Sequence, residues 1–120
     1  MNLQLVTIGD KGQSNKERVH VTALADINLA YYVAFASRWA PDNTIYRVPT
    51  HAFWFPSVIA KSGDHIVLYT CAGKDTSEPR PDGKTNHFFY WGLPTVLFND
   101  PGVSLTIFEA LSWATFARSA

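Results

Sequence analysis

The feature that most constrains the fold of this chain is a series of short apolar blocks separated by turn-forming residues. Between residues 53 and 93, the segments 53–55, 65–70 and 87–93 are rich in aromatic and β-branched residues and have the length of strands. Pro, Gly and Asp stand between them. Short apolar runs bounded by such turn residues are typical of all-β domains. The sequence therefore predicts packed sheets in this part of the chain.

Alternation of apolar and polar residues extends the pattern toward the start of the chain. Residues 3–8 are predicted to form a first strand, with Leu3 and Leu5 facing inward. In residues 19–23, apolar positions alternate with His and Thr, as they do in a strand with one buried face. Two strands are therefore expected before residue 24.

The longest alternation covers residues 27–36 and predicts a further strand. One face of this strand would carry its largest side chains, Ile27, Leu29, Tyr31, Val33 and Phe35. The other face, rich in Ala, includes Tyr32, which would then be exposed and available for an interface. A helix over residues 23–36 is the alternative, because Ala and Leu favour helices.

The remaining segments complete a predicted set of seven or eight short strands. Strands are expected at residues 44–48, 104–109 and 111–116, and residues 73–86 are expected to form a mobile polar loop at the surface. Regular short strands of this kind indicate an antiparallel sandwich or barrel. The 120 residues are predicted to form one domain, 1–120.

Charge and composition exclude several classes of partner. Ten basic and ten acidic residues cancel, so the net charge gives no attraction toward nucleic acid or anionic lipid. The start of the chain lacks the pattern of a secretion signal, and its apolar windows are too short for a membrane span. A soluble, cytoplasmic protein with no membrane partner is expected. The single cysteine, Cys71, is predicted to be a buried structural thiol.

Three motifs make the chain resemble the lamin-tail-like domain. They are Phe53-Trp54-Phe55-Pro56, the run from Lys61-Ser62-Gly63-Asp64 through Thr70, and Phe89-Tyr90-Trp91-Gly92-Leu93, with Glu17-Arg18-Val19-His20-Val21 near the start. The resemblance covers about residues 45–110 and is greatest to small free-standing bacterial members. It implies an immunoglobulin-like β-sandwich that acts as a non-catalytic module, without catalytic residues or cofactors.

The residues themselves also give no sign of catalysis. The four histidines share no metal-ligand spacing, and Asp64-His65 is interpreted as a turn residue followed by a strand-end residue. No nucleophile elbow or phosphate-binding glycine loop is present. We therefore predict no catalytic residue, no metal site, no cofactor and no enzymatic activity.

Adjacent aromatic residues provide the candidate binding site. Neighbours on a strand point to opposite faces, so some rings in the two aromatic runs must lie outside a single core. Burial of these rings under a loop is one explanation, and an interaction face or dimer contact is the other. The predicted binding residues lie in the two aromatic runs and the 73–86 loop, and are Trp54, Phe55, Tyr90, Trp91, Lys74 and Arg80.

The function predicted from these observations is a non-catalytic module that contacts a protein partner or a second copy of itself. One alternative is a nucleic-acid-binding module that stacks bases on aromatic rings and places Arg47, Lys61, Lys74, Arg80 and Lys84 on phosphates. The second is a small hydrolase whose polar pocket holds His51, His65 or His87 beside a carboxylate.

Overall fold

The structure is a computed structural model that describes residues 1–117. These residues form ten strands and one 3₁₀ turn, with no α-helix among them, so the all-β prediction is confirmed. No helix in this range is long and apolar enough to cross a membrane.

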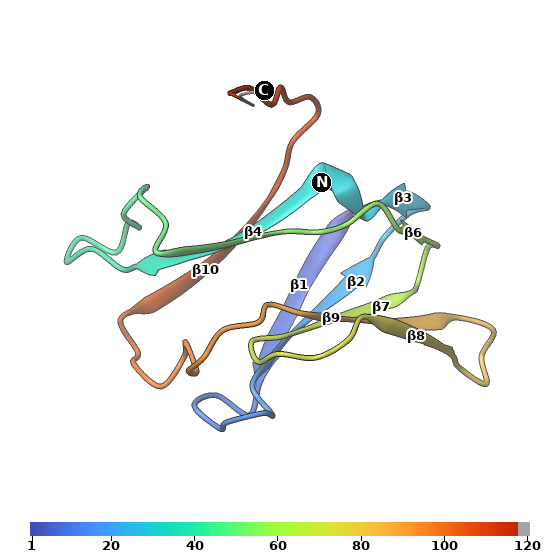
Figure 1. Cartoon of the computed structure of the whole chain (residues 1–120), viewed down its shortest axis with the longest axis horizontal. Helices are drawn as coiled ribbons and strands as arrows, with labels where there is room; N and C mark the ends of the chain where they lie inside the picture. Colours follow the sequence, from blue (N-terminus) through green and yellow to red (C-terminus); the bar gives the residue numbers. More distant parts are fainter. Residues whose placement is uncertain (118–120) are drawn as a thin grey trace.

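The strands form three sheets, labelled in Figure 1. A five-stranded sheet has the order β1 (Leu3–Gly9), β2 (Arg18–Ala23), β7 (His65–Tyr69), β9 (Thr85–Tyr90) and β8 (Thr76–Pro79). A three-stranded sheet has the order β10 (Val103–Glu109), β4 (Tyr32–Arg38) and β5 (His51–Trp54). The short strands β3 (Ile27–Asn28) and β6 (Ile59–Ala60) pair with each other.

One hydrophobic core joins the two larger sheets. The alternation predicted for residues 19–23 is confirmed, because Val19, Val21 and Ala23 are buried and face the core from β2. Tyr32, Ala34 and Ala36 of β4 are also buried, and the rings of Phe55 and Phe89 meet edge to face at 5.4 Å. Burial of these side chains is the main favourable contribution to folding.

The predicted strand over residues 27–36 is interrupted. After β3, the side chain of Asn28 accepts a hydrogen bond from the Ala30 amide at 2.9 Å and starts the 3₁₀ turn Leu29–Tyr31. The turn shifts the alternation, so Leu29 and Tyr32 are both buried. The helix alternative is realised only as this single turn, and the expected exposure of Tyr32 is wrong.

The prediction of a wholly antiparallel arrangement is wrong at one pair of strands. β7 and β9 run parallel, with Leu68 opposite Phe89. The chain passes from β7 to the sheet edge, forms β8 there, and returns through the turn at residues 80–84 as β9, between β7 and β8. An edge position suits β8, because Pro79 cannot donate a ladder hydrogen bond. The predicted loop 73–86 therefore contains β8 and the start of β9.

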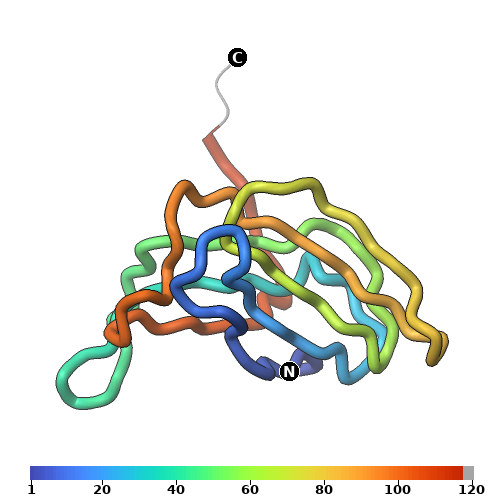
Figure 2. The backbone as a smooth tube through the Cα atoms, turned by 90° about the horizontal axis from the view of Figure 1, so that it is seen from below, coloured from blue at the N-terminus to red at the C-terminus, as the bar shows by residue number. Residues whose placement is uncertain are grey.

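Two other predicted strands are absent from residues 1–117. Segment 44–48 makes only a single bridge, between Ile45 and Trp39. Segment 111–116 pairs with no strand in the described chain, and its residues are exposed. The chain leaves the sheets after β10, as Figures 1 and 2 show.

A buried carboxylate ties together the loops at one end of the core. Glu17, 1% exposed, accepts four hydrogen bonds from neutral donors. The Thr70 hydroxyl and Leu97 amide donate to Oε1 at 2.9 and 2.7 Å, and the Gly12 and Phe98 amides donate to Oε2 at 2.8 and 3.0 Å. A buried charge is tolerated only when it is hydrogen-bonded in this way.

Replacing Glu17 by Gln should destabilise the protein. The amide NH₂ group of Gln would face backbone N–H donors, so at least one buried donor would lose its acceptor, at a cost on the order of 2 kcal/mol. Urea unfolding followed by tryptophan fluorescence measures the difference. The matched control is Glu78→Gln on exposed β8, for which a change within about 0.5 kcal/mol is expected. Equal stability of the two variants would contradict this role.

Candidate functional site

The outer face of the three-stranded sheet is apolar. Tyr32, Ala34 and Ala36 of β4 point into the core, so Val33 and Phe35 point outward. Residues paired across strands share a face, which places four more side chains beside these two. The six outward-facing residues are all uncharged: Val33, Phe35, Ala52, Trp54, Thr106 and Phe108.

Aromatic rings from neighbouring segments extend this surface. Phe35 and Phe108 lie 5.5 Å apart between ring centroids, and Trp113 contacts Trp54 at 5.0 Å and Tyr31 at 5.5 Å, both edge to face. We call Tyr31, Val33, Phe35, Trp54, Phe108 and Trp113 the aromatic face. Its two tryptophans are each 48% exposed. Contiguous exposed apolar side chains of this kind mark interaction sites.

Trp54 is held in a fixed orientation within the aromatic face. Its indole Nε1 donates a hydrogen bond to the carbonyl oxygen of Ala30 at 2.6 Å. The bond satisfies the polar atom of the side chain and leaves one side of the ring in solvent. A ring fixed before binding loses little conformational entropy when a partner covers it.

Only Trp54 among the predicted binding residues belongs to the aromatic face. Phe55 follows Trp54, points to the opposite side of the chain and is 2% exposed. The prediction that Phe55 is a surface binding residue is therefore wrong, because it lies in the core. Trp91 packs against the core, with its ring 6.0 Å from that of Phe53. Because Phe53 points inward and Trp54 outward, Trp91 and Trp54 lie on different sides of β5.

Tyr90 lies on the outer side of the five-stranded sheet. Its ring stacks on Tyr69 of the parallel neighbour β7, at 5.3 Å and an interplanar angle of 11°. Burial, followed by the nearby Tyr69, raises the pKa of Tyr90. This tyrosine pair is separate from the aromatic face, so the two predicted aromatic runs do not form one site.

The two basic residues predicted for binding differ in their surroundings. Lys74 is exposed before β8. Arg80 donates to both carboxylate oxygens of Asp82, from Nε at 3.1 Å and Nη2 at 2.8 Å, and also to the Gly63 carbonyl at 3.3 Å. The charge of Arg80 is therefore paired locally, and its side chain fixes the turn between β8 and β9.

Sequence reasoning missed most of the aromatic face. The alternation in residues 27–36 did place Tyr31, Val33 and Phe35 together, but large apolar side chains are usually assigned to the core. Nothing in the sequence indicated that the Ala-rich side would be the inner one. Trp113 was assigned to a strand, so its contact with Trp54 was not foreseen.

The buried His87 lies beside a carboxylate at the start of β7. His87 Nε2 lies 2.9 Å from Asp64 Oδ2, and the amides of Lys61 and Thr85 donate to the same carboxylate at 2.9 and 3.0 Å. Burial opposes the charge of Asp64, but these hydrogen bonds outweigh it and lower the pKa of the carboxyl group. Ser77 pairs with His87 across β8 and β9, yet no hydrogen bond joins their side chains in the described structure. The role of Asp64 as a turn residue accounts for the arrangement.

Within the described residues, no group of three or more His, Cys, Asp or Glu side chains is placed to hold a metal ion. Comparison with known proteins finds no matching family model, curated protein or solved structure. The resemblance to the lamin-tail-like domain therefore stays a prediction that its sequence motifs carry.

From the close pair of His20 and His65, we predict that the free energy of unfolding decreases in mild acid. Nδ1 of His20 lies 3.1 Å from Nε2 of His65, and burial is the main cause that lowers the pKa of each ring. Nearby positive charge adds to it, from Arg18 at His20 and from Arg80 at His65. The folded state thus binds fewer protons than the unfolded chain, whose histidines titrate near 6.5.

The folded protein therefore keeps its full stability, as far as these two histidines are concerned, above pH 6.5. This stability is lost as the pH falls through the lowered pKa values of the folded protein. The free energy of unfolding, measured in urea, should therefore decrease between about pH 7.5 and pH 5. His65→Asn should make this decrease smaller, whereas His51→Asn, which changes a histidine outside the pair, should not. An unchanged pH dependence in the His65→Asn variant would refute the assignment.

Proposed function

We propose that this protein is a non-catalytic interaction module that contacts other proteins through the aromatic face. We further propose that its fold is an immunoglobulin-like β-sandwich related to the lamin-tail-like domain. The core shared by the five-stranded and three-stranded sheets supports this proposal. So do the motifs around Trp54, Asp64 and Trp91, although the parallel pair β7–β9 departs from a purely antiparallel sandwich.

The observation that carries the functional proposal is the outward side of β10, β4 and β5. In a sheet with one face in water, the water-facing positions of each strand are normally polar or charged. Here the outward positions of three adjacent strands are uncharged, and three aromatic rings on them are bordered by Tyr31 and Trp113. Aromatic side chains provide most of the binding energy in protein interfaces when water is excluded from them.

The partner that fits this surface is a second copy of the chain. Two identical faces can meet about a twofold axis only if no like charges are brought together. The outward strand positions satisfy this requirement, and the whole chain has a net charge of zero. The aromatic face is therefore complementary to itself.

The structure offers less support for a nucleic-acid partner. Of the basic residues considered for phosphate contacts, Arg80 is paired with Asp82 and Lys61 lies 3.7 Å from Asp26. Arg47 lines a hollow next to Phe35 of the aromatic face. Stacking on Trp54 without a basic groove would give weak binding, because phosphate contacts supply most of the affinity for nucleic acid.

The test is sedimentation equilibrium over about 10 to 300 µM, where dimers with micromolar dissociation constants are resolved. The wild-type chain should dimerise, with little dependence on salt because the contact is apolar. Trp54→Ala should weaken the dimer at least about tenfold, or about 1.4 kcal/mol. Phe108→Glu should abolish it, because the substitution buries two unpaired charges at the interface.

The matched control is Ile59→Ala. Ile59 is 55% exposed but lies on β6, outside the aromatic face, so its truncation should leave dimerisation unchanged. Circular dichroism establishes that each variant is folded. A wild-type chain that stays monomeric throughout the range, or a folded Phe108→Glu variant that dimerises normally, would overturn the proposal.

A further inference from the structure

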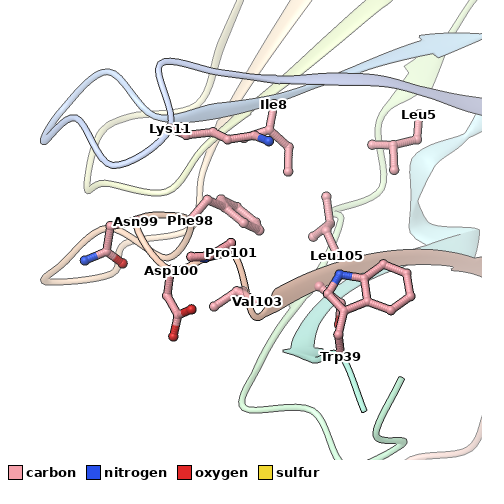
Figure 3. A pocket seen from close by; sticks show the side chains of 11 residues that line it. Leu5, Ile8, Lys11, Trp39, Phe98, Asn99, Asp100, Pro101, Val103 and Leu105 are labelled. Carbon is pink, nitrogen blue, oxygen red and sulfur yellow. The ribbon is translucent and has the colours of Figure 1, made fainter. Parts of the chain in front are cut away.

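A cleft lies where the two larger sheets are open toward each other, and its lining combines apolar side chains with Lys11, Asn99 and Asp100. It has a volume of about 420 Å³ and is bordered by Leu5 and Ile8 of β1 on one side and Val103 and Leu105 of β10 on the other. Figure 3 shows these side chains facing each other across the gap, with Phe98 between them. The volume is within the usual range of ligand-binding pockets.

The exposure of Leu5 shows that the cleft lacks side chains to fill it. Leu5 pairs with Val21, which is fully buried, so both side chains point to the interior side of the sheet. Leu5 is nevertheless 41% exposed. Its predicted inward orientation is thus supported, but the described residues leave it partly exposed to solvent.

Both strands that border the cleft are sheet edges. β1 pairs only with β2, and β10 pairs only with β4, within the described chain. The amide of Ala110 donates to the carbonyl oxygen of Tyr31, and the amide of Trp39 donates to the carbonyl oxygen of Gly102. The even-numbered residues along β10 therefore direct their backbone groups toward β4. By alternation, Leu105 and Ile107 direct their N–H and C=O groups away from β4. The cleft therefore combines apolar side chains with available backbone donors and acceptors, as a site for an added strand requires.

A separate hollow lies near the other end of these edge strands. A second cavity of about 190 Å³ lies between Asn2, just before β1, and Glu109 at the end of β10. This second cavity is also lined by Tyr31, Tyr32 and Leu111 and shares no lining residue with the first.

The segment at residues 110–117 has the properties of the missing strand. Leu111, Trp113 and Thr115 alternate on one side, and none of its eight residues is charged. Leu111 and Phe116 are 77% and 96% exposed, and the segment pairs with no strand in the described chain. Eight extended residues span about 26 Å, close to the roughly 23 Å of the seven-residue strand β10.

This segment cannot easily reach the cleft of its own molecule. It continues directly from β10, so pairing with the free edge of β10 would require a tight reversal. Residues 110–117 contain no Gly, Pro, Asn or Asp to form that turn. Figures 1 and 2 show the segment leading away from the sheets, and its Trp113 rests on Trp54 and Tyr31.

We propose that residues 110–117 of one copy add as a strand to the edge of β10 in a second copy, with Leu111 and Trp113 entering the cleft. Main-chain hydrogen bonds to Leu105 and Ile107 would supply affinity, and the two apolar side chains would supply specificity. The donor segment and the acceptor cleft are different surfaces, so the contact is head to tail and can extend into rings or chains. The cleft lies outside the aromatic face, but Trp113 belongs to that face in the described structure, so the two contacts compete for this side chain.

Complementation between two blocked variants tests this arrangement. Both are made in the Phe108→Glu background, which removes contact through the aromatic face. Leu105→Glu blocks the cleft but leaves a donor segment, and the double change Leu111→Ser with Trp113→Ser blocks the donor but leaves a cleft. Each variant alone should be monomeric by sedimentation, and an equimolar mixture should form a one-to-one dimer that does not extend.

The unblocked Phe108→Glu chain should form longer species under the same conditions. A mixture that stays monomeric, or a donor-blocked variant that still associates as the unblocked chain does, would overturn the proposal. Head-to-tail contact would also change the sedimentation of the wild-type and Phe108→Glu chains. The aromatic-face dimer is therefore compared with and without Phe108→Glu in chains that carry Leu105→Glu, which blocks the cleft and lies outside the aromatic face. The two proposals are then judged separately.

If the Leu105→Glu variant does not fold, a peptide-binding experiment tests the proposed site instead. The synthetic segment Ala-Leu-Ser-Trp-Ala-Thr-Phe-Ala, capped at both ends, is added to the donor-blocked chain and amide hydrogen exchange is followed. The expected result is at least roughly tenfold slower exchange at Leu105 and Ile107, with a peptide in which both Leu and Trp are Ser as the control. Absence of binding up to about 1 mM, a very weak affinity, or protection confined to other strands, would contradict the proposed site.

Discussion

The carboxylate of Glu17 is the interaction on which the arrangement of the loops depends. It is buried, forms no ion pair within residues 1–117, and accepts four hydrogen bonds from the chain itself. Because removal of a charge from water is costly, these bonds must form together when the protein folds. They connect the turn before β2, the end of β7 and the segment at Leu97 and Phe98 that leads into β10. The position of β10, and with it the cleft and one strand of the aromatic face, follows from this connection.

The aromatic face results from the way β4 packs. Ala34 and Ala36 are fully buried in the same core as the rings of Phe55 and Phe89. The larger Val33 and Phe35 are left on the outside. Close packing in the core thus determines which side of the strand contacts solvent or a partner. A surface that would be unfavourable on an isolated molecule is then available for association.

Most strands could be predicted from the chain because alternation is a local property. The strand predicted from alternation at residues 19–23 corresponds to β2, and the short segments predicted at 65–70 and 104–109 correspond to β7 and β10. The failures occurred where local pattern and available partners disagreed: segment 111–116 has a strand pattern but no neighbouring strand, whereas β8 has little pattern and forms because it pairs with β9. For the candidate site, Trp54 was recognised, but Phe55 was placed on the surface because the direction of each side chain depends on where the core lies.

By itself, the sequence determined the all-β class, most of the strands and the balance of charge, because these follow from side-chain chemistry and residue spacing along the chain. Only the tertiary structure decided which face of β4 is buried, that β7 and β9 run parallel, and that β1 and β10 leave an open cleft between them. These features depend on contacts between residues far apart in the chain, whose packing selects one arrangement among several that the same local pattern allows.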